Sequence, residues 1–286
     1  MSLWLVLAVN SVTLGGLLFL LSAGFSLIFG LMRIPNLTHG SFFMLGAYLA
    51  ASLIHAGLGF WTAALLSGLL VGAFGGVIER LLLRRLAGAE LAQVLVTLGL
   101  SFMVADVCLK VWTGDPIRIA TPPALTGTAR VAGLTFPIYR LAISVIAVAF
   151  ALALWALLDR TRLGAMIRAG VDDPAMARVA GIRVSRLFTI VFCLGAWLAG
   201  FAGVIGGPIL SVYPGLDQEM LPLALVVVIL GGSGSLLGSL VGSLVVGFLY
   251  NFGQAMFPEL AYVVLFLPML LVLVVRPHGL FGRQPV

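Results

Sequence analysis

The chain has 286 residues, of which 62% are hydrophobic and only 9% are charged, whereas soluble proteins carry roughly 25% charged residues. This composition excludes a soluble globular domain, a disordered chain and a disulfide scaffold. The net charge of +6 is weak evidence for a nucleic-acid partner, because basic residues in a membrane protein usually gather in cytoplasmic loops.

Long runs without a charged residue follow one another along most of the chain. Because one bilayer crossing takes about 20 apolar residues, these runs hold roughly eight to ten crossings. We predict an all-α, polytopic transmembrane helical bundle with about eight or nine spans, forming one domain over residues 1–286. The predicted spans are 5–29, 37–54, 60–78, 91–112, 141–158, 187–210 and 260–275, and the run 220–258 holds either two crossings or one crossing and a re-entrant segment.

Basic residues gather after the third span, between the fifth and sixth spans, and after the last span. The positive-inside rule places these loops in the cytoplasm, so we expect the N-terminus outside and the C-terminus inside. Loop 159–186 is then cytoplasmic and loop 113–136 external. Glycines and prolines exclude a long helix in the external loop, whose residues 130–136 could form a short strand or hairpin arm. A short external loop with Asp217 and Glu219 is expected after the sixth span.

Small residues recur at four-residue spacing on several predicted spans. Residues four apart share one helix face, and small side chains let two backbones approach closely. We therefore expect these positions to pack helix against helix. They are Gly68, Gly72, Gly76, Gly195, Gly203, Gly238 and Gly242.

Two stretches break the helical pattern inside apolar sequence, one in each half of the chain. The first surrounds Pro35, which disfavours helix before it, and Asn36 or Thr38 can cap a new helix after it. The second is rich in glycine. Such paired breaks are typical of transporters with discontinuous helices around a central path; two tight cytoplasmic turns are the alternative. The candidate path residues are Asn36, Thr38, His39, Gly40, Gly231, Gly232, Ser233 and Gly234.

The sequence contains no recognisable catalytic or metal-binding motif. A P-loop needs Gly-Lys-Ser/Thr, and the only lysine, Lys110, stands between leucine and valine. The histidines His39, His55 and His278 are scattered and match no metal motif. We therefore expect no catalytic residue, no metal and no cofactor in this chain.

The cytoplasmic loop contains a predicted short surface helix. Asp173 suits its N-cap, Pro174 its first position and Gly181 its C-terminal cap. Because a short helix is marginal alone, we interpret it as a docking element for a partner, with a helix lying on the membrane surface as the alternative. The residues assigned to this coupling helix are Asp172, Asp173, Pro174, Ala177, Arg178, Ala180 and Gly181.

Two charges lie within a predicted span. Asp106 and Lys110 are four residues apart on segment 91–112, a spacing that brings side chains together on one helix face. A structural ion pair is the favoured interpretation, and a proton relay is the alternative, weakly supported by a single carboxylate.

Five stretches carry a family resemblance: Ile28–Gly40 with Met44–Tyr48, Arg160–Ala169, Asp173–Ile182, Gly231–Gly242 and Arg276–Gly282. In this order they resemble the branched-chain amino acid ABC transporter permease family of the LivH type. Two departures fall near the first break: Thr38 stands where the family often has alanine, and Pro35 replaces a more usual aliphatic residue. The substrate is therefore left open, because relatives carry other small solutes such as urea or other amino acids.

The resemblance implies an importer subunit of the bacterial inner membrane that is not itself an enzyme. It implies a paralogous permease subunit or a second copy as neighbour, two cytoplasmic ATP-binding subunits docked on residues 174–180, a periplasmic solute-binding protein and alternating access. An ion-coupled secondary transporter is the competing hypothesis. Such a transporter needs carboxylates near the middle of the membrane, and Asp106 is the candidate that we identify in the sequence. A membrane-embedded enzyme ranks far below both.

Overall fold

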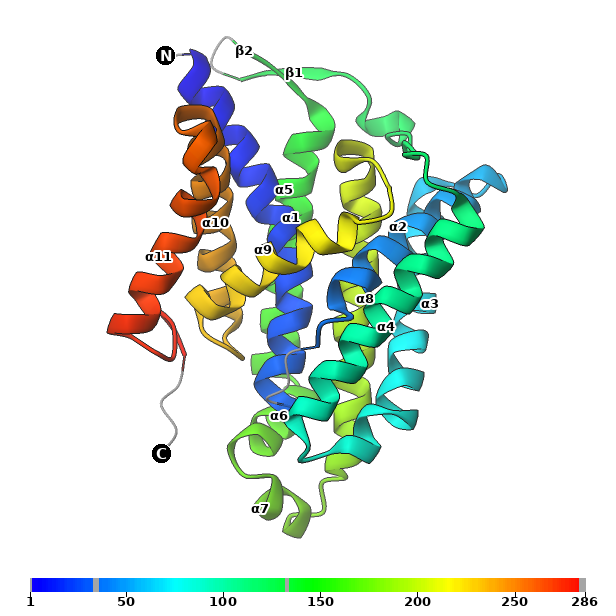
Figure 1. The fold of residues 1–286 in the computed structure, drawn as a ribbon, viewed down its shortest axis with the longest axis vertical. Helices are drawn as coiled ribbons and strands as arrows, with labels where there is room; N and C mark the ends of the chain where they lie inside the picture. Colours follow the sequence, from blue (N-terminus) through cyan, green and yellow to red (C-terminus); the bar gives the residue numbers. More distant parts are fainter. Residues whose placement is uncertain (1, 33–35, 132–133, 283–286) are drawn as a thin grey trace.

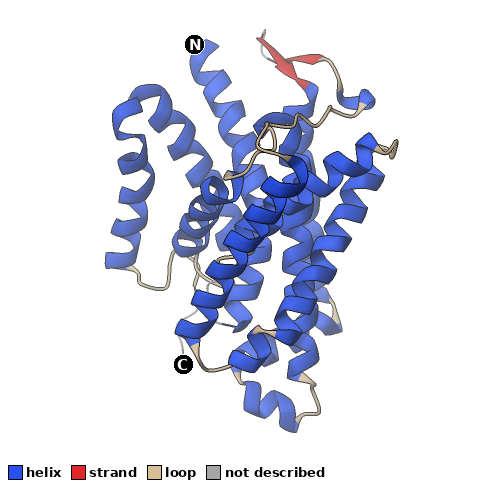
Figure 2. Cartoon of the chain, turned by 45° about the vertical axis from the view of Figure 1, so that its right-hand side comes forward, coloured by secondary structure: helices blue, strands red, loops and turns tan. Residues whose placement is uncertain are grey.

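The computed structural model describes residues 2–32, 36–131 and 134–282. Over these ranges the chain is a bundle of α-helices with one small hairpin (Figures 1 and 2). Within the described residues, seven segments are long and apolar enough to cross a membrane. Their helices are α1 (Ser2–Met32), α3 (Phe60–Leu81), α4 (Glu90–Trp112), α5 (Ile138–Arg160), α8 (Val184–Leu210), α10 (Leu236–Met256) and α11 (Ala261–Val275). The short helical turn Pro258–Leu260 precedes α11 and extends that segment to 18 residues.

Two further apolar helices are shorter than a full crossing. Helix α2 (His39–His55) has 17 residues and α9 (Leu216–Gly231) has 16. A 16-residue helix is about 24 Å long, and the hydrocarbon core is about 30 Å thick. The predicted all-α polytopic fold is confirmed, and among the described residues seven segments, instead of the predicted eight or nine, reach spanning length. Residues 220–258 hold most of the short α9 followed by the span-length α10, so this run contains one crossing and a shorter piece.

Helix α1 forms the centre of the bundle. It packs against α8 and α10 on its long sides, and α9 lies across it in Figure 1. In the most apolar 18-residue stretch of α1, 83% of the residues are buried, whereas in that of the segment containing α11 only 6% are buried. Exposed apolar side chains on α4, α5 and α11 therefore face lipid or another subunit, and the core lies around α1, α2 and α8.

The predicted packing glycines lie at helix contacts. Gly68, Gly72 and Gly76 of α3 face Cys193 and Trp197 of α8. A Cβ on Gly195 would lie 2.7 Å from the carbonyl oxygen of Gly24 in α1, and a Cβ on Gly242 would lie 2.8 Å from that of Val227. Gly203 meets the backbone of Phe43, and Gly238 meets that of Gly231. Side chains at these positions would force the helices apart.

One end of the bundle carries a hairpin. Strands β1 (Thr128–Val131) and β2 (Leu134–Pro137) pair antiparallel, so the stretch 130–136, predicted as a short strand or a hairpin arm, is divided between the two strands. The same loop forms an isolated bridge between Ile117 and Val212. This bridge ties the loop to the segment that leads into α9.

The predicted ion pair on α4 does not form. Asp106 and Lys110 are both exposed, and the salt bridges among the described residues are Glu79–Arg84 at 2.9 Å and Asp159–Arg168 at 3.2 Å. An exposed pair four residues apart contributes only about 0.2–0.5 kcal/mol. Spacing alone therefore does not hold the two side chains together.

Candidate functional site

Asp217, in the first turn of α9, is a carboxylate buried in the middle of the bundle. Its Oδ2 accepts hydrogen bonds from the hydroxyls of Ser41 at 3.0 Å and Ser101 at 3.3 Å. Ser101 is the midpoint of α4, so the carboxylate lies at half the depth of a spanning helix. Asp217 is 2% exposed, and its Oδ1 has no hydrogen-bond partner among the described residues.

The sequence-based assignment of Asp217 to a short external loop is therefore wrong. Helix α8 ends at Leu210, and α9 already begins at Leu216. Gly215 makes the turn between them with φ of +103°, a conformation that glycine adopts without steric cost. A carboxylate in the first turn of a helix is stabilised by the helix dipole, so Asp217 belongs to the helix and not to the loop.

The two short helices begin at the same place. A Cβ on Gly40, in the first turn of α2, would lie 2.6 Å from the carbonyl oxygen of Asp217 and 2.9 Å from the Cβ of Leu221. The absence of a side chain at Gly40 thus allows the first turns of α2 and α9 to touch. Their positive ends converge near the Asp217 carboxylate, an arrangement that favours negative charge at that point.

The break before α2 is held by the neighbouring spans. The Thr38 amide donates to Asn36 Oδ1 at 3.2 Å, and the Thr38 hydroxyl donates to the carbonyl of Thr97 in α4 at 2.8 Å. His39 Nε2 lies 3.0 Å from the carbonyl of Leu21 in α1. Thr38 is the N-cap residue, but its hydroxyl bonds to α4 and not to its own helix. Arg33, Ile34 and Pro35 lie outside the described residues.

Buried polar atoms that have no partner within the described part of the chain gather around these helices. An unsatisfied buried polar group costs about 1–3 kcal/mol, and polar groups inside membrane bundles usually mark functional paths. Their concentration along α1, α2 and the start of α9 makes this region the candidate functional site. The atoms are Ser22 Oγ, Asn36 Nδ2, His39 Nδ1, Tyr48 Oη and Asp217 Oδ1, with Gln93 Oε1 on α4 as the sixth.

The glycine-rich break forms a tight turn between α9 and α10. Gly232 and Gly234 have φ of +99° and +77°, and the Gly234 amide donates to the Ser26 hydroxyl of α1 at 3.1 Å. Gly231 and Gly232 are buried, while Ser233 and Gly234 are exposed. This stretch therefore joins two helices and packs on the end of α1.

The C-terminal segment caps the end of α9. The Leu280 amide donates to the Leu230 carbonyl at 2.9 Å, and the Phe281 amide donates to the Gly231 carbonyl at 3.0 Å. A Cβ on Gly232 would lie 2.9 Å from the carbonyl oxygen of His278. The last carbonyls of α9 are thus bonded by residues that come long after it in the chain.

Among the described residues, the two breaks do not contact each other. The first contacts α1 at Leu21, and the second contacts α1 at Ser26 and Gly30. Nine helical residues separate Leu21 from Gly30, which is about 13 Å along the helix axis. Helix α9 connects them, because its first turn lies against α2 and its last turn forms the glycine-rich stretch.

One face of α9 carries exposed polar residues close to the middle of the bundle. Gln218 and Glu219 follow Asp217 directly, and both are exposed. Burial and a hydrogen bond with the Glu219 side chain raise the pKa of Tyr213, which lies in the segment before α9. A charged residue near mid-depth is costly against lipid, so this face must meet water or protein.

Sequence reasoning missed Asp217, Ser41 and Ser101 as site residues. The signal was present in the run Met220–Gly231, an apolar stretch too short to span. Two carboxylates directly before such a stretch are typical of the first turn of a helix, but the depth at which that helix starts is not contained in the local sequence.

Helix α7 (Pro174–Val179) extends beyond the other end of the bundle (Figure 1). Asp173 Oδ1 accepts from the amides of Ala175 and Met176, both at 2.9 Å. Gly181 has φ of +82°, as expected for a C-terminal cap. Val179 is 83% exposed, and Met176 is exposed beside it. The tip of the molecule therefore presents apolar side chains on a capped helix.

A longer helix precedes α7 that the sequence analysis did not separate. Helix α6 (Arg162–Asp172) begins at Thr161, whose hydroxyl accepts from the Gly164 amide at 3.2 Å. Ala177 of α7 is buried, whereas Arg178 and Ala180 are exposed. Loop 159–186 is thus a helical pair whose second member points outward.

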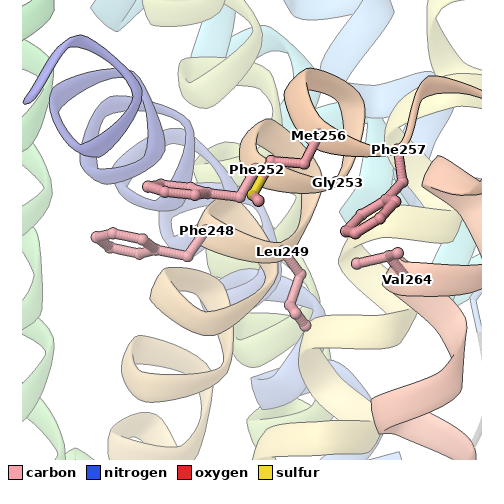
Figure 3. A pocket seen from close by; sticks show the side chains of 7 residues that line it. All are labelled: Phe248, Leu249, Phe252, Gly253, Met256, Phe257 and Val264. Carbon is pink, nitrogen blue, oxygen red and sulfur yellow. The ribbon is translucent and has the colours of Figure 1, made fainter. Parts of the chain in front are cut away.

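An apolar groove lies between α10 and α11 (Figure 3). Its volume is about 210 Å³, and side chains such as Phe248, Phe252, Met256 and Val264 line it. The lining side chains contain no hydrogen-bonding group, so the groove offers nothing to orient a charged or zwitterionic solute.

Comparison with known proteins identifies relatives along nearly the whole chain. A family model described as branched-chain amino acid transport system / permease component matches residues 7–273. The branched-chain amino acid permease proteins BraD of Pseudomonas aeruginosa and LivH of Escherichia coli K12 are both 29% identical, over 97% of this chain and 95% of theirs. The ribose import permease RbsC of Escherichia coli K12 is 30% identical, over 76% of this chain and 68% of its own. No solved structure matches the chain.

Proposed function

Because this chain belongs to the family of permease components of branched-chain amino acid transport systems, we propose that it carries branched-chain amino acids across the bacterial inner membrane. Its family makes it a multi-pass membrane permease subunit of an ABC importer and not an enzyme. The observation that carries the substrate proposal is the coverage of its relatives. The amino acid permeases align over 95% of their length, whereas the ribose permease aligns over 68%.

The translocation path runs along α9 in this proposal. Because α2 and α9 are short and start at mid-depth, they can move enough to pass a small solute while the full-length spanning helices stay intact. The path residues Asn36, Thr38, His39 and Gly40 hold the start of α2, and Asp217 holds the start of α9 beside it. The exposed face of Gln218 and Glu219 then lines the path where a paralogous permease subunit or a second copy completes it.

The glycine-rich residues Gly231–Gly234 act as the inner pivot of α9 in the same proposal. Gly232 and Gly234 have positive φ, and Gly234 packs on Gly30 of α1. A glycine turn accepts changes of φ and ψ that other residues resist. Motion of α9 would therefore concentrate at this turn.

Coupling to ATP hydrolysis occurs through α7. Two cytoplasmic ATP-binding subunits each contact one permease subunit, and a periplasmic solute-binding protein delivers the substrate to the opposite face, near the hairpin. The exposed side chains of Met176 and Val179 enter the ATPase, and the caps Asp173 and Gly181 keep the helix rigid enough to transmit movement. In this proposal the N-terminus lies outside and α7 lies in the cytoplasm.

The test is uptake of labelled leucine into proteoliposomes. The chain is reconstituted alone and together with its candidate ATPases, a paralogous permease subunit and a binding protein, and a panel adds isoleucine, valine, urea and ribose. We expect uptake of the branched-chain amino acids only in the full assembly, and only with ATP on the ATPase side. Uptake by the chain alone under a proton or sodium gradient would overturn the proposal.

A further inference from the structure

A pocket lined by arginines lies where α3 ends and α8 begins. Its volume is about 670 Å³, within the range of small-molecule sites. The polar lining side chains are those of Arg80, Arg84, Arg183, Ser185, Arg186 and Thr189. We call it the basic pocket.

One arginine of the basic pocket is fixed by an internal network. Arg84 donates to both carboxylate oxygens of Glu79 and to the carbonyl of Ser185 at 3.0 Å. The Thr189 hydroxyl donates to Glu79 Oε2 at 2.8 Å and also contacts Arg84. This buried carboxylate is therefore satisfied, and the network gives the pocket a rigid wall.

The other three arginines keep their charge uncompensated. Arg80, Arg183 and Arg186 are exposed, and none of them forms an ion pair within the part of the chain that the structure describes. Three guanidinium groups around one hollow attract an anion with several oxygens, because a guanidinium binds phosphate through two parallel hydrogen bonds.

The surroundings of the pocket indicate that the anion carries hydrocarbon chains. Ile190 lines the pocket and is 47% exposed. Val77 and Leu81, on the same end of α3, are also exposed. Both α3 and α8 belong to segments that can span the membrane. The basic pocket therefore lies at the boundary between headgroups and acyl chains, and apolar surface continues from it into the hydrocarbon region.

We propose that the basic pocket binds the phosphate headgroup of an anionic phospholipid, whose acyl chains lie along α3 and α8. The phosphate contacts Arg80, Arg183 and Arg186, and the Arg84–Glu79 pair holds the wall behind it. Juxtamembrane arginines recognise anionic lipids in this way. An acidic surface of a protein partner is less favoured, because no residue of α7 lines the pocket.

The experiment is native mass spectrometry of the purified full chain with phosphatidylglycerol or phosphatidylcholine of identical acyl chains. The test variant combines Arg80→Gln, Arg183→Gln and Arg186→Gln. The matched control combines Arg160→Gln, Arg162→Gln and Arg178→Gln, which removes three exposed arginines elsewhere on the same end. We expect the wild type to retain phosphatidylglycerol preferentially, and the test variant to lose this retention roughly a hundredfold at about 1 kcal/mol per arginine.

Several outcomes would overturn the proposal. Equal loss in the test and control variants would show general charge attraction, and displacement by excess inorganic phosphate would show a site for soluble anions. If the test variant retains phosphatidylglycerol as well as the wild type does, the pocket does not bind this lipid. If the triple variant fails to fold, the single variants Arg183→Gln and Arg186→Gln, each expected to lose about fivefold, decide the question.

Discussion

At the scale of single residues, the carboxylate of Asp217 is the group whose position is hardest to explain by packing alone. We expect Asp217→Asn to fold, because an amide oxygen can still accept from Ser41 and Ser101. If the charge serves transport, substrate uptake in the assembled importer should fall at least about tenfold, since the charge at mid-depth contributes several kcal/mol of local interaction. If the Asp217→Asn variant transports at the wild-type rate, Asp217 serves the structure of the bundle and not transport.

The control for this variant is Ser101→Ala. It removes the longer of the two hydrogen bonds to the carboxylate, at 3.3 Å, and the contact of Ser101 with the Ser41 hydroxyl at 2.8 Å, while the carboxyl group stays in place. A loss of about 1 kcal/mol in stability is expected, measured as a small shift in thermal unfolding, with uptake largely retained.

Gly40 is the second residue that we test, because it allows the first turns of α2 and α9 to touch. A leucine there would collide with the Asp217 carbonyl and with Leu221, because even a Cβ would lie 2.6 and 2.9 Å from them. We expect Gly40→Leu to separate the first turns of α2 and α9, lower the unfolding temperature and abolish uptake. Gly57→Leu is not a matched control because of its positive φ, whereas Gly99→Leu is, since a Cβ at Gly99 meets nothing within 4 Å.

At the scale of elements, the short helix α7 tests the coupling proposal. Asp173→Lys removes a cap that accepts two amides, and such a loss costs about 0.5–2 kcal/mol of helix stability. Gly181→Pro replaces a residue with φ of +82° by one fixed near −65°. Both variants should stay folded in the membrane and lose ATP-driven uptake. Normal uptake in both would remove α7 from the coupling role.

The glycine turn between α9 and α10 is tested in the same assay. Gly232→Leu and Gly234→Leu place a side chain at left-handed φ, against His278 in one case and Gly30 in the other. We expect both variants to block flux. A thermal unfolding measurement separates lost packing from lost motion, because a purely dynamic defect leaves the unfolding temperature near that of the wild type.

The elements also show how far sequence reasoning reaches. Hydropathy predicts the apolar helices, and local chemistry predicts both caps of α7, because each depends on residues close together in the chain. The meeting of Gly40 with Asp217 joins positions far apart in sequence, so no local pattern contains it. Asp217 and Glu219 also resemble loop residues in isolation, and the depth of α9 follows only from its packing on α2 and from the hydrogen bond between Asp217 and Ser101 of α4.

At the scale of the whole molecule, the bundle exposes an apolar surface on one helix and a polar surface on another. Helix α11 exposes apolar side chains such as Leu270 and Val274, whereas α9 exposes Gln218 and Glu219. If the α9 face lines an aqueous path and α11 faces lipid, a cysteine at Gln218 should react with a water-soluble thiol reagent much faster than one at Leu270. The experiment replaces the native Cys108 and Cys193 first. Equal labelling at both positions would contradict the proposed path.

The bonds from Leu280 and Phe281 to the end of α9 also set an order of events during synthesis. Their donors follow α11 in the chain, so the final carbonyls of α9 lack these two partners until α11 has been synthesised. The end of α9 therefore reaches its final hydrogen bonding only after the helices that precede residue 276 have been made. A chain cut after Val275 should insert its spans yet leave the end of α9 loosely held.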